Sequence, residues 1–431
     1  MNLILGKIHD NIDAIKSLEE LQENIITTLE NKKIKSEIVI EACNKLSQEI
    51  DIEENIFLLT ALGLSKDKAL KELEKVKFML SKEYLTSRIN IEVPDYFDKA
   101  LPYQAIDRDK MVIEKWQPLG VLLHIVAGNA EGLPAYSLIE GLLMGNINIL
   151  KLPGDDNGIT ITILLKLIEI EPRIKDYIYV YDFPSEDIES IKKLEKVSDA
   201  VVLWGGKEAV SAIRKLTDTN TKIIEWGHKL SFTYATKNGI NEVNLKALAR
   251  HICETDQLLC SSSQGIFLET EDMNEVHEFC EIFLDILDKT TLEYPDRNIS
   301  NGLLGKITLQ LYTEELETAY DKGKRVFKKG NCSIIAYEDS NLDNSIMHRN
   351  LWIRPLSRNT IIRNFKKYKN YLQTAILICD ETEKDQISEK LIKSGVVRIV
   401  GENSLVDSYL GMPHDGEYPL RRYMRKISID I

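Results

Sequence analysis

Two short segments in the middle of the chain carry side chains that can act on a carbonyl group. Glu225 lies in IIEWGHK and Cys260 in LLCSSSQ, and the span between them is long enough for one helix and a return strand. Cysteine is the strongest nucleophile among the side chains at neutral pH, and it attacks aldehydes and thioesters when its surroundings lower its pKa. The pair predicts covalent catalysis with Cys260 as the nucleophile. Taken alone, a cysteine between apolar neighbours is more often a buried, inert thiol.

Three further segments place polar residues or glycines where predicted strands end. Asn129 in HIVAGNAEGLPA stands between a strand and a helix, where its amide can stabilise an oxyanion or simply form the turn. Lys151 ends NINILKLPG, a position that suits a nucleotide ribose or its phosphate as well as a solvated lysine. Gly205 and Gly206 open a helix whose free N–H groups can hold a phosphate, and an ordinary turn has the same pattern. The fingerprint GxGxxG does not occur.

The order of strands and helices indicates how these residues are brought together. From Leu119 onward, β-branched runs alternate with helical stretches that are long enough to connect parallel strands. This alternation predicts a doubly wound parallel sheet, whose ligands bind beyond the carboxyl ends of the strands, where Glu225 falls. A second alternation after Lys229 predicts a second α/β domain, with Cys260 just before the apolar run QGIFLE.

Composition argues against several other classes of protein. A net charge of −13 argues against non-specific nucleic-acid binding, which needs a basic surface. No apolar run approaches the ~18 residues that span a bilayer, and the first residues do not read as a secretory signal. Six dispersed cysteines without a CxxC pair indicate a reducing cytoplasm.

We expect no metal site, because no ligand spacing is found among His124, His228, His251 and His414. Of these, His124 and His251 are expected to be structural.

The ordered set Asn129, Lys151, Gly205, Glu225 and Cys260 resembles the aldehyde dehydrogenase superfamily over about residues 115 to 400. More narrowly, IEWGHKLSF, the CSSSQ around Cys260 and the helical N-terminal extension look like the LuxC-type acyl-CoA reductases of bacterial luminescence. The resemblance implies an aldehyde dehydrogenase-like α/β fold.

The resemblance also implies a role for each residue of the set. Cys260 is the nucleophile, Asn129 and the backbone N–H of Cys260 form the oxyanion site, and Glu225 matches the general base. The residues expected to contact the cofactor are Lys151, Gly205, Gly206 and Gly227. Two departures from the superfamily pattern are present: His228 stands where the ELGGK motif has a glycine, and WIRPLSRN stands in place of the EIFGP segment that supplies a carboxylate to the nicotinamide ribose.

Four parts of the chain are expected from the length of 431 residues and from this pattern. Residues 1–100 are predicted to form a helical N-terminal segment, and 101–228 a Rossmann-like NAD(P)-binding domain. Residues 229–400 are predicted to form the catalytic domain. Residues 401–431 are expected to pack back on the protein or to support an oligomer.

The function that follows is reduction of an acyl thioester to a long-chain fatty aldehyde, with NADPH or alternatively NADH, through a thioacyl group on Cys260. Acyl-CoA or an acyl-carrier thioester is the expected donor, an acyl-protein synthetase is a candidate partner, and a homo-oligomer is expected.

Two alternatives stay open. In the first, Glu225 activates water and the protein is an aldehyde dehydrogenase that oxidises aldehydes to acids. In the second, the chain is a non-catalytic subunit that carries an acyl group or docks a synthetase.

Overall fold

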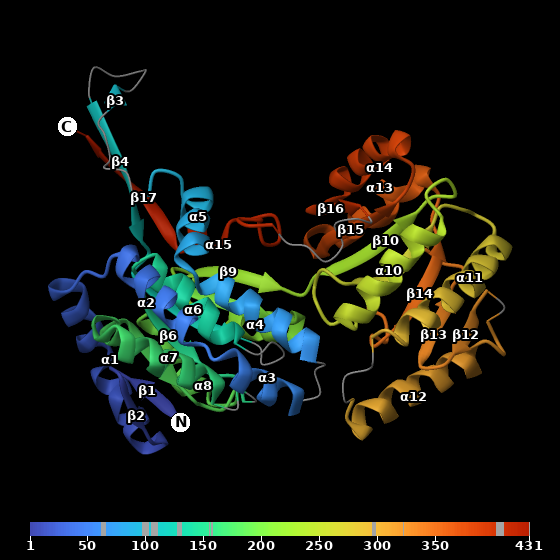
Figure 1. Cartoon of the computed structure of the whole chain (residues 1–431). Coiled ribbons are helices and arrows are strands. Elements are labelled where there is room, and N and C mark those ends of the chain that lie inside the picture. Colours follow the sequence, from blue (N-terminus) through green and yellow to red (C-terminus); the bar gives the residue numbers. More distant parts are fainter. Residues whose placement is uncertain are drawn as a thin grey trace. The chain divides into compact units, whose positions relative to one another are not determined.

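The structure is a computed structural model of the chain. It describes residues 1–61, 66–96, 103–104, 111–126, 132–154, 156, 158–294, 299–321, 323–401 and 409–430. Contacts between residues group the chain into two compact units, which can be followed by colour in Figure 1. Unit 1 comprises Met1–Leu59, Lys66–Gly227 and Tyr409–Ile431, and unit 2 comprises Thr60–Ser65 and His228–Ser408. The four-part division expected from the sequence stays a prediction.

Unit 1 is built on a seven-stranded sheet with the strand order β2-β1-β7-β6-β5-β8-β9. Its parallel strands are β5 (Val121–Val126), β6 (Ile147–Lys151), β7 (Ile178–Tyr181), β8 (Ala200–Gly205) and β9 (Lys222–Gly227). The connections contain α6 (Leu133–Leu143), α7 (Ile159–Ile170), the 3₁₀ helix η1 (Pro172–Tyr177), α8 (Ile188–Lys196) and α9 (Lys207–Leu216). Every residue of β6 and β7 is buried, as expected for strands covered by helices on both faces. The predicted doubly wound parallel sheet is confirmed.

The N-terminal segment differs from the prediction at its start. β1 (Asn2–Ile4) and β2 (Lys7–His9) form a hairpin, and β1 pairs antiparallel with β7. Leu5 and Gly6 join the two strands with φ of 50° and 78°, the left-handed conformation of a tight hairpin turn. The helices that follow are α1 (Asn11–Asn31), α2 (Ser36–Glu49), α3 (Ile52–Ala61), α4 (Lys66–Leu80) and α5 (Lys82–Glu92). The segment therefore contributes strands to the sheet as well as helices.

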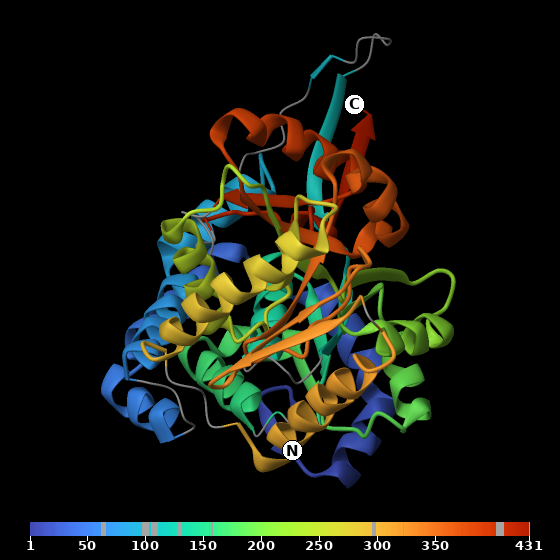
Figure 2. The same cartoon turned by 90° about the vertical axis from the view of Figure 1, so that its right-hand side faces the viewer.

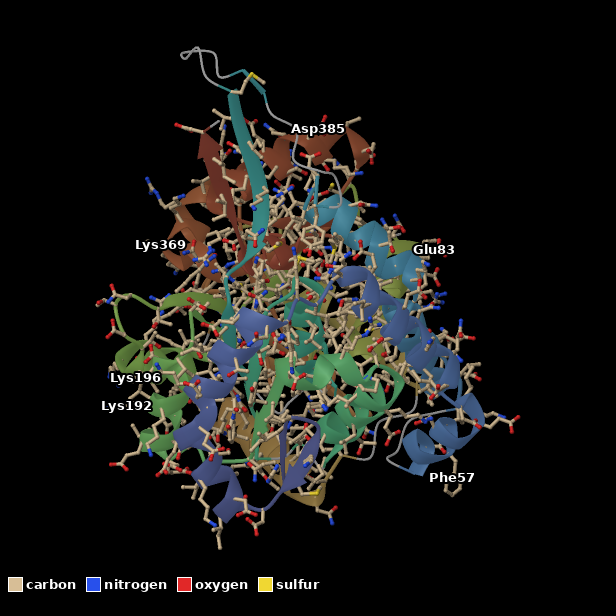
Figure 3. All side chains as sticks on the ribbon, turned by 90° about the vertical axis from the view of Figure 1, so that its left-hand side faces the viewer. Phe57, Glu83, Lys192, Lys196, Lys369 and Asp385 are labelled. Atoms are coloured by element: carbon tan, nitrogen blue, oxygen red, sulfur yellow. The ribbon has the colours of Figure 1, made fainter. Side chains whose placement is uncertain are left out.

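Apolar stripes determine how the helices of unit 1 pack. α8 buries Ile191 and Leu194, whereas Lys192 and Lys196 point away from the ribbon into solvent (Figure 3). α1 packs on α8, and α2 packs on α6 and α7. The N-terminal helices thus cover the helices of the doubly wound sheet, and the apolar core of unit 1 includes residues of both.

A three-stranded antiparallel sheet joins the C-terminal residues to the middle of unit 1. Its strands, in order, are β17 (Met424–Asp430), β4 (Met111–Pro118) and β3 (Tyr103–Gln104). β17 pairs with β4 from Met424 opposite Pro118 to Asp430 opposite Val112. The short helix α15 (Pro419–Arg422) precedes β17. The described C-terminal residues therefore belong to unit 1.

Unit 2 is built on a second seven-stranded sheet, with the order β12-β13-β14-β11-β10-β15-β16. The strands are β10 (Leu230–Ala235), β11 (Ser263–Leu268), β12 (Arg325–Lys329), β13 (Cys332–Ala336), β14 (Asn350–Pro355), β15 (Leu372–Ile378) and β16 (Arg398–Gly401). All are parallel except β12, which pairs antiparallel with β13. The predicted second α/β domain is confirmed.

Helices pack on this sheet in two groups, which can be followed in Figure 2. One apolar cluster contains residues of α10 (Glu242–Thr255) and α11 (Met273–Thr291), and another contains residues of α13 (Ile361–Phe365) and α14 (Glu381–Ser394). The remaining helices are α12 (Asn301–Glu317), η2 (Arg358–Thr360) and η3 (Lys366–Tyr371). Across both units, no helix in the described ranges combines the length and the apolar composition that crossing a membrane requires.

Candidate active site

Cys260 lies in the turn between α10 and β11 of unit 2, and its side chain is exposed. α10 ends where Asp256 and Gln257 adopt φ of 47° and 61°. The turn is closed around Cys260 by two bonds: the N–H of Ser262 donates to the carbonyl of Leu259 at 2.9 Å, and the N–H of Leu259 donates to Ser262 Oγ at 3.2 Å. This geometry presents the thiol at the amino end of β11, just before the strand, as the sequence suggested.

The other thiols of the chain have different surroundings. Cys43, Cys253, Cys280 and Cys332 are buried, and Cys379 is half-buried. Burial raises the pKa of Cys43 to about 12, and burial also raises the pKa of Cys280. A thiol with so high a pKa carries almost no thiolate at neutral pH, so exposure distinguishes Cys260 from these cysteines.

Two side chains that the sequence reasoning missed contact Cys260 directly. Gln373 Nε2 donates to Cys260 Sγ at 3.2 Å. Ser231 Oγ donates to the carbonyl oxygen of Cys260 at 2.6 Å and accepts from the N–H of Thr374 at 3.0 Å. These residues come from the amino ends of β10 and β15, which are neighbours in the sheet. A polar Gln-Thr pair near the start of the otherwise apolar run LQTAILI was the available signal in the sequence.

A β-bulge explains why Gln373 reaches the thiol. Leu230 pairs with Leu372 and Phe232 pairs with Ala375, so Ser231 alone stands opposite two residues of β15. An extra residue of this kind bends the strand and redirects side chains, and such bulges are frequent beside active sites.

A buried polar network fixes the turn on the sheet. Gln264 Nε2 donates to the carbonyl of Gln257 at 3.0 Å, and Gln257 Nε2 donates to the carbonyl of Ser263 at 3.1 Å. Asp256 also forms a buried ion pair with Arg349 at 3.3 Å. Because such groups are costly to leave unpaired when buried, the network holds the turn in one conformation.

Glu225 lies in β9 of unit 1, and its carboxylate is bound by an arginine. Arg214 of α9 donates from Nε at 3.0 Å and from Nη2 at 2.5 Å, both to Glu225 Oε2. A Cβ at Gly227 would come within 3.1 Å of Glu225 Oε1, so glycine at this position leaves room for the carboxylate. Glu225 belongs to unit 1 and Cys260 to unit 2. Their joint action therefore stays a prediction.

The residues predicted to hold the cofactor lie at one edge of the sheet of unit 1. Lys151 ends β6, Gly205 ends β8 and Gly227 ends β9, and these strands run parallel. Gly206 is the N-cap of α9 and offers no side-chain cap to the free N–H groups of the first turn; a Cβ there would meet nothing within 4 Å. An uncapped helix start and open space at the carboxyl ends of a doubly wound sheet fit a dinucleotide phosphate.

Lys151 is not a solvated lysine. Its side chain is only 6% exposed, and Nζ donates to Ser185 Oγ at 3.0 Å. Burial lowers the pKa of its ammonium group, and the nearby carboxylates of Asp182 and Glu186 partly oppose this shift. Asn129, which the sequence suggests as an oxyanion donor, lies outside the described residues.

Comparison with known proteins identifies the family. The family model for acyl-CoA reductase (LuxC) matches residues 32–426. The chain belongs to the acyl-CoA reductase (LuxC) family. The long-chain acyl-protein thioester reductase of Aliivibrio fischeri is 26% identical over 383 residues, which cover 86% of this chain and 76% of that protein. The enzyme of the same name from Vibrio harveyi is 24% identical over 384 residues, with the same coverage of 86% and 76%.

Solved structures show the aldehyde dehydrogenase fold in this LuxC family member. Salicylaldehyde dehydrogenase from Pseudomonas putida G7 superposes with a TM-score of 0.74 at 14% identity, over 97% of this chain and 90% of that chain. Betaine aldehyde dehydrogenase from Staphylococcus aureus in complex with NAD⁺ gives a TM-score of 0.72 at 14% identity, over 97% and 86% of the two chains. Both the superfamily and the narrower LuxC resemblance are confirmed.

The segment WIRPLSRN of this LuxC family member has a structural role of its own. Arg358 donates from Nε to Glu269 Oε1 at 2.6 Å and from Nη2 to Glu383 Oε1 at 2.5 Å. Glu269 directly follows the carboxyl end of β11, whereas Cys260 precedes the amino end of the same strand. This ion-pair cluster is therefore at the opposite edge of the unit 2 sheet from the thiol.

The histidines also have distinct surroundings. The ring of His124 is buried between Ser137 Oγ at 2.8 Å and Asn148 Oδ1 at 3.0 Å. The ring of His414 lies 5.2 Å from that of Trp204 and 5.1 Å from that of Trp226, beside the ends of β8 and β9. In the part of the chain that the structure describes, no three His, Cys, Asp or Glu side chains are grouped so that they could hold a metal ion.

Proposed function

We propose that the chain reduces a long-chain acyl thioester to the fatty aldehyde, through a thioacyl group on Cys260 and with NADPH as the reductant. The observation that carries this proposal is an exposed thiol in a hydrogen-bonded turn at the amino ends of parallel strands, with an amide N–H directed at its sulfur. Membership of the acyl-CoA reductase (LuxC) family supports it, and so do the names of the relatives, which describe acyl-protein thioester reductases.

The chemistry consists of two additions to the same carbonyl carbon. The Cys260 thiolate attacks the thioester and forms a new C–S bond, while the C=O electron pair moves to oxygen. When the carbonyl re-forms, the bond to the carrier sulfur breaks and the carrier leaves as a thiol after taking up a proton from solvent. We assign stabilisation of the oxyanion to Asn129 and the backbone N–H of Cys260.

Reduction then replaces the C–S bond to Cys260 by a C–H bond. When bound, NADPH supplies the hydride, that is, two electrons and one hydrogen. The oxygen of the second adduct re-forms the carbonyl and expels Cys260 Sγ as a thiolate, which releases the aldehyde. In sum, thioester, NADPH and one proton give aldehyde, carrier thiol and NADP⁺.

The cofactor is assigned to the carboxyl edge of the unit 1 sheet. Gly205 and Gly206 directly precede α9, and the free N–H groups in the first turn of this helix would hold a phosphate of the dinucleotide. Lys151 is the basic group that we assign to the 2′-phosphate, and this assignment is the reason for preferring NADPH to NADH. Gly227 contributes to the site indirectly, because a glycine at this position leaves space for the carboxylate of Glu225.

Oxidation of aldehydes to acids is less well supported. That reaction needs a carboxylate that is free to take a proton from water. The carboxylate of Glu225 instead accepts two hydrogen bonds from Arg214. A non-catalytic subunit is also less well supported, because a scaffold has no need of an exposed thiol with an amide N–H directed at its sulfur.

The proposed function also includes an acyl donor and partner proteins. We propose that the acyl group arrives as acyl-CoA or as an acyl-carrier thioester, that an acyl-protein synthetase is a partner, and that the chain forms a homo-oligomer. All six cysteines are free thiols, which supports a reducing compartment such as the cytoplasm.

The test is turnover of a defined substrate. Purified protein is incubated with myristoyl-CoA and NADPH, loss of NADPH is followed by absorbance, and the aldehyde is trapped and identified. We expect stoichiometric NADPH loss and aldehyde formation. Cys260→Ala should abolish both, whereas Cys379→Ala, a matched change at a half-buried cysteine, should retain them. Unchanged NADPH consumption by the Cys260→Ala variant would sink the proposal.

A further inference from the structure

The amide of Gln373 is directed at the sulfur of Cys260. Nε2 is a donor and lies 3.2 Å from Sγ, so the sulfur is the acceptor in this bond. Gln373 is 6% exposed, whereas Cys260 is exposed. The donor is therefore largely shielded from water, although the nucleophile is open to substrate. A hydrogen bond to the charged form of an acid stabilises that form, and here the charged form is the thiolate.

The backbone around Gln373 is held on both sides. Its carbonyl accepts from the N–H of Val397 at 3.1 Å, which leads into β16. On the other side, Ser231 Oγ links the N–H of Thr374 to the carbonyl of Cys260. The same hydroxyl thus joins β15 to the nucleophile's own backbone. Gln373 and Cys260 are fixed relative to each other by bonds that do not involve the sulfur, which is the preorganisation that an activating donor needs.

Charged side chains at this end of the unit 2 sheet include Arg398, which stands opposite Thr374 in the β15–β16 pair, and two groups with partners of their own. Asp256 of the turn forms a buried ion pair with Arg349 at the start of β14, at 3.3 Å. Lys229, just before β10, donates from Nζ to the carbonyl of Asn370 at 2.7 Å. Gln373 is a neutral donor, so its effect on the thiol does not depend on its own titration.

We propose that Gln373 is a catalytic residue that stabilises the Cys260 thiolate through its side-chain amide and thereby makes the sulfur reactive towards the acyl carbonyl. The proposal rests on the proposed function, in which Cys260 is the nucleophile. The thiol proton is released to solvent, and the electron pair left on sulfur forms the bond to the acyl carbon.

The test measures the reactivity of the sulfur without substrate or nucleotide. The rate of alkylation of Cys260 by iodoacetamide is followed against pH by peptide mass spectrometry, in the full-length protein and in Gln373→Leu and Gln373→Glu variants. The midpoint of the pH profile reports the pKa of the thiol. We expect Gln373→Leu to move it upward by about one unit, which corresponds to about tenfold slower alkylation at neutral pH. The carboxylate of Gln373→Glu should move it further upward.

The controls separate this role from a structural one. Gln386→Leu removes a glutamine of α14 that accepts from Arg358, in the same unit and away from the thiol, and should leave the midpoint unchanged. Thermal unfolding identifies a variant that does not fold, and in that case Gln373→Asn, which keeps the amide on a shorter side chain, provides the second comparison. A folded Gln373→Leu or Gln373→Glu protein with an unshifted midpoint would overturn the proposal.

Failure of the proposed function would give a different experimental result from failure of the role of Gln373. If the midpoint depends on Gln373 but the unaltered protein does not consume NADPH with myristoyl-CoA, the activation of Cys260 stands and the acyl reductase function falls. If turnover depends on Cys260 but the midpoint does not depend on Gln373, the reductase function stands and the role of Gln373 falls.

Discussion

The guanidinium of Arg214 binds the carboxylate of Glu225 through two hydrogen bonds, at 3.0 Å from Nε and 2.5 Å from Nη2. In the proposed function this pairing would bear on the fate of the thioacyl enzyme, because a carboxylate that activates water would hydrolyse it to the acid. Both bonds end on Oε2, so the guanidinium occupies an oxygen that would otherwise be open to a water molecule.

Replacement of Arg214 should therefore increase the fraction of acid among the products. We expect Arg214→Gln to raise the ratio of acid to aldehyde by up to about fivefold, because an ion pair as exposed as this one contributes at most about 1 kcal/mol. The ratio is measured by chromatography after single turnovers with myristoyl-CoA. Lys215→Gln, an exposed change at the next position of α9, is the control. An unchanged ratio in the Arg214 variant would mean that the pair does not restrain Glu225.

Loss of the Ser231 hydroxyl should reduce both stability and turnover. Ser231 is fully buried, and Ser231→Ala removes the acceptor of the Thr374 N–H and the donor to the Cys260 carbonyl. We expect the free energy of unfolding to fall by about 1–3 kcal/mol, the usual cost of leaving a buried polar group unpaired. Urea unfolding and kcat are measured together. Ser340→Ala removes a hydroxyl that donates to the Pro355 carbonyl at the far end of β14, so it should affect stability and spare kcat.

The parts of the fold that sequence reasoning found are those with local patterns. The strands β5 to β9 are apolar runs separated by helices, and Lys151, Gly205 and Glu225 stand at or near their ends, so the carboxyl edge of one sheet could be predicted. β1 and β2 were missed because each contains three residues, too few for a periodic pattern. The pairing of β17 with β4 joins the C-terminal residues to a strand that lies far away in the sequence, so no local sequence pattern indicates it.

The surroundings of the thiol could not be predicted for the same reason. Gln373 reaches Cys260 only because β15 lies beside β10 and because a bulge places two residues opposite Ser231. Neither the strand order of a sheet nor a bulge is encoded in the spacing of residues along one strand. Arg214 was missed because an arginine near the end of a helix usually faces solvent.

Replacement of Lys151 should change the preference between the two nicotinamide cofactors. If the ammonium group binds the 2′-phosphate, Lys151→Met should lower kcat/KM for NADPH about tenfold or more and leave NADH nearly unaffected, because a hydrogen bond to a charged group contributes about 1.5–3 kcal/mol. Steady-state kinetics with each cofactor provide the measurement. Lys192→Met, on α8 where the side chain points into solvent (Figure 3), is the control. Equal losses with both cofactors would argue for a structural role of Lys151.

Two buried histidines should make the protein less stable in mild acid. Burial lowers the pKa of His124 and of His251 from 6.5 to about 4. Well above pH 6.5 both histidines are neutral in the folded and in the unfolded chain, so the contribution of these groups is constant. As the pH falls from 6.5 towards 4, the unfolded chain takes up protons that the folded chain does not, and stability is lost throughout this window.

The two histidines should nevertheless respond differently to substitution. His124 is bound to Ser137 and Asn148, whereas neither ring nitrogen of His251 has a hydrogen-bond partner among the described residues. We expect His251→Leu to keep or raise stability at neutral pH and to flatten the acid dependence, because the variant removes a buried polar group without leaving a partner unpaired. His124→Leu should flatten it as well but should lower stability at neutral pH, since two buried partners lose their bonds. Urea unfolding between pH 4 and pH 7 measures both effects. An acid dependence that is as steep in His251→Leu as in the unaltered chain would show that His251 is protonated in the folded state.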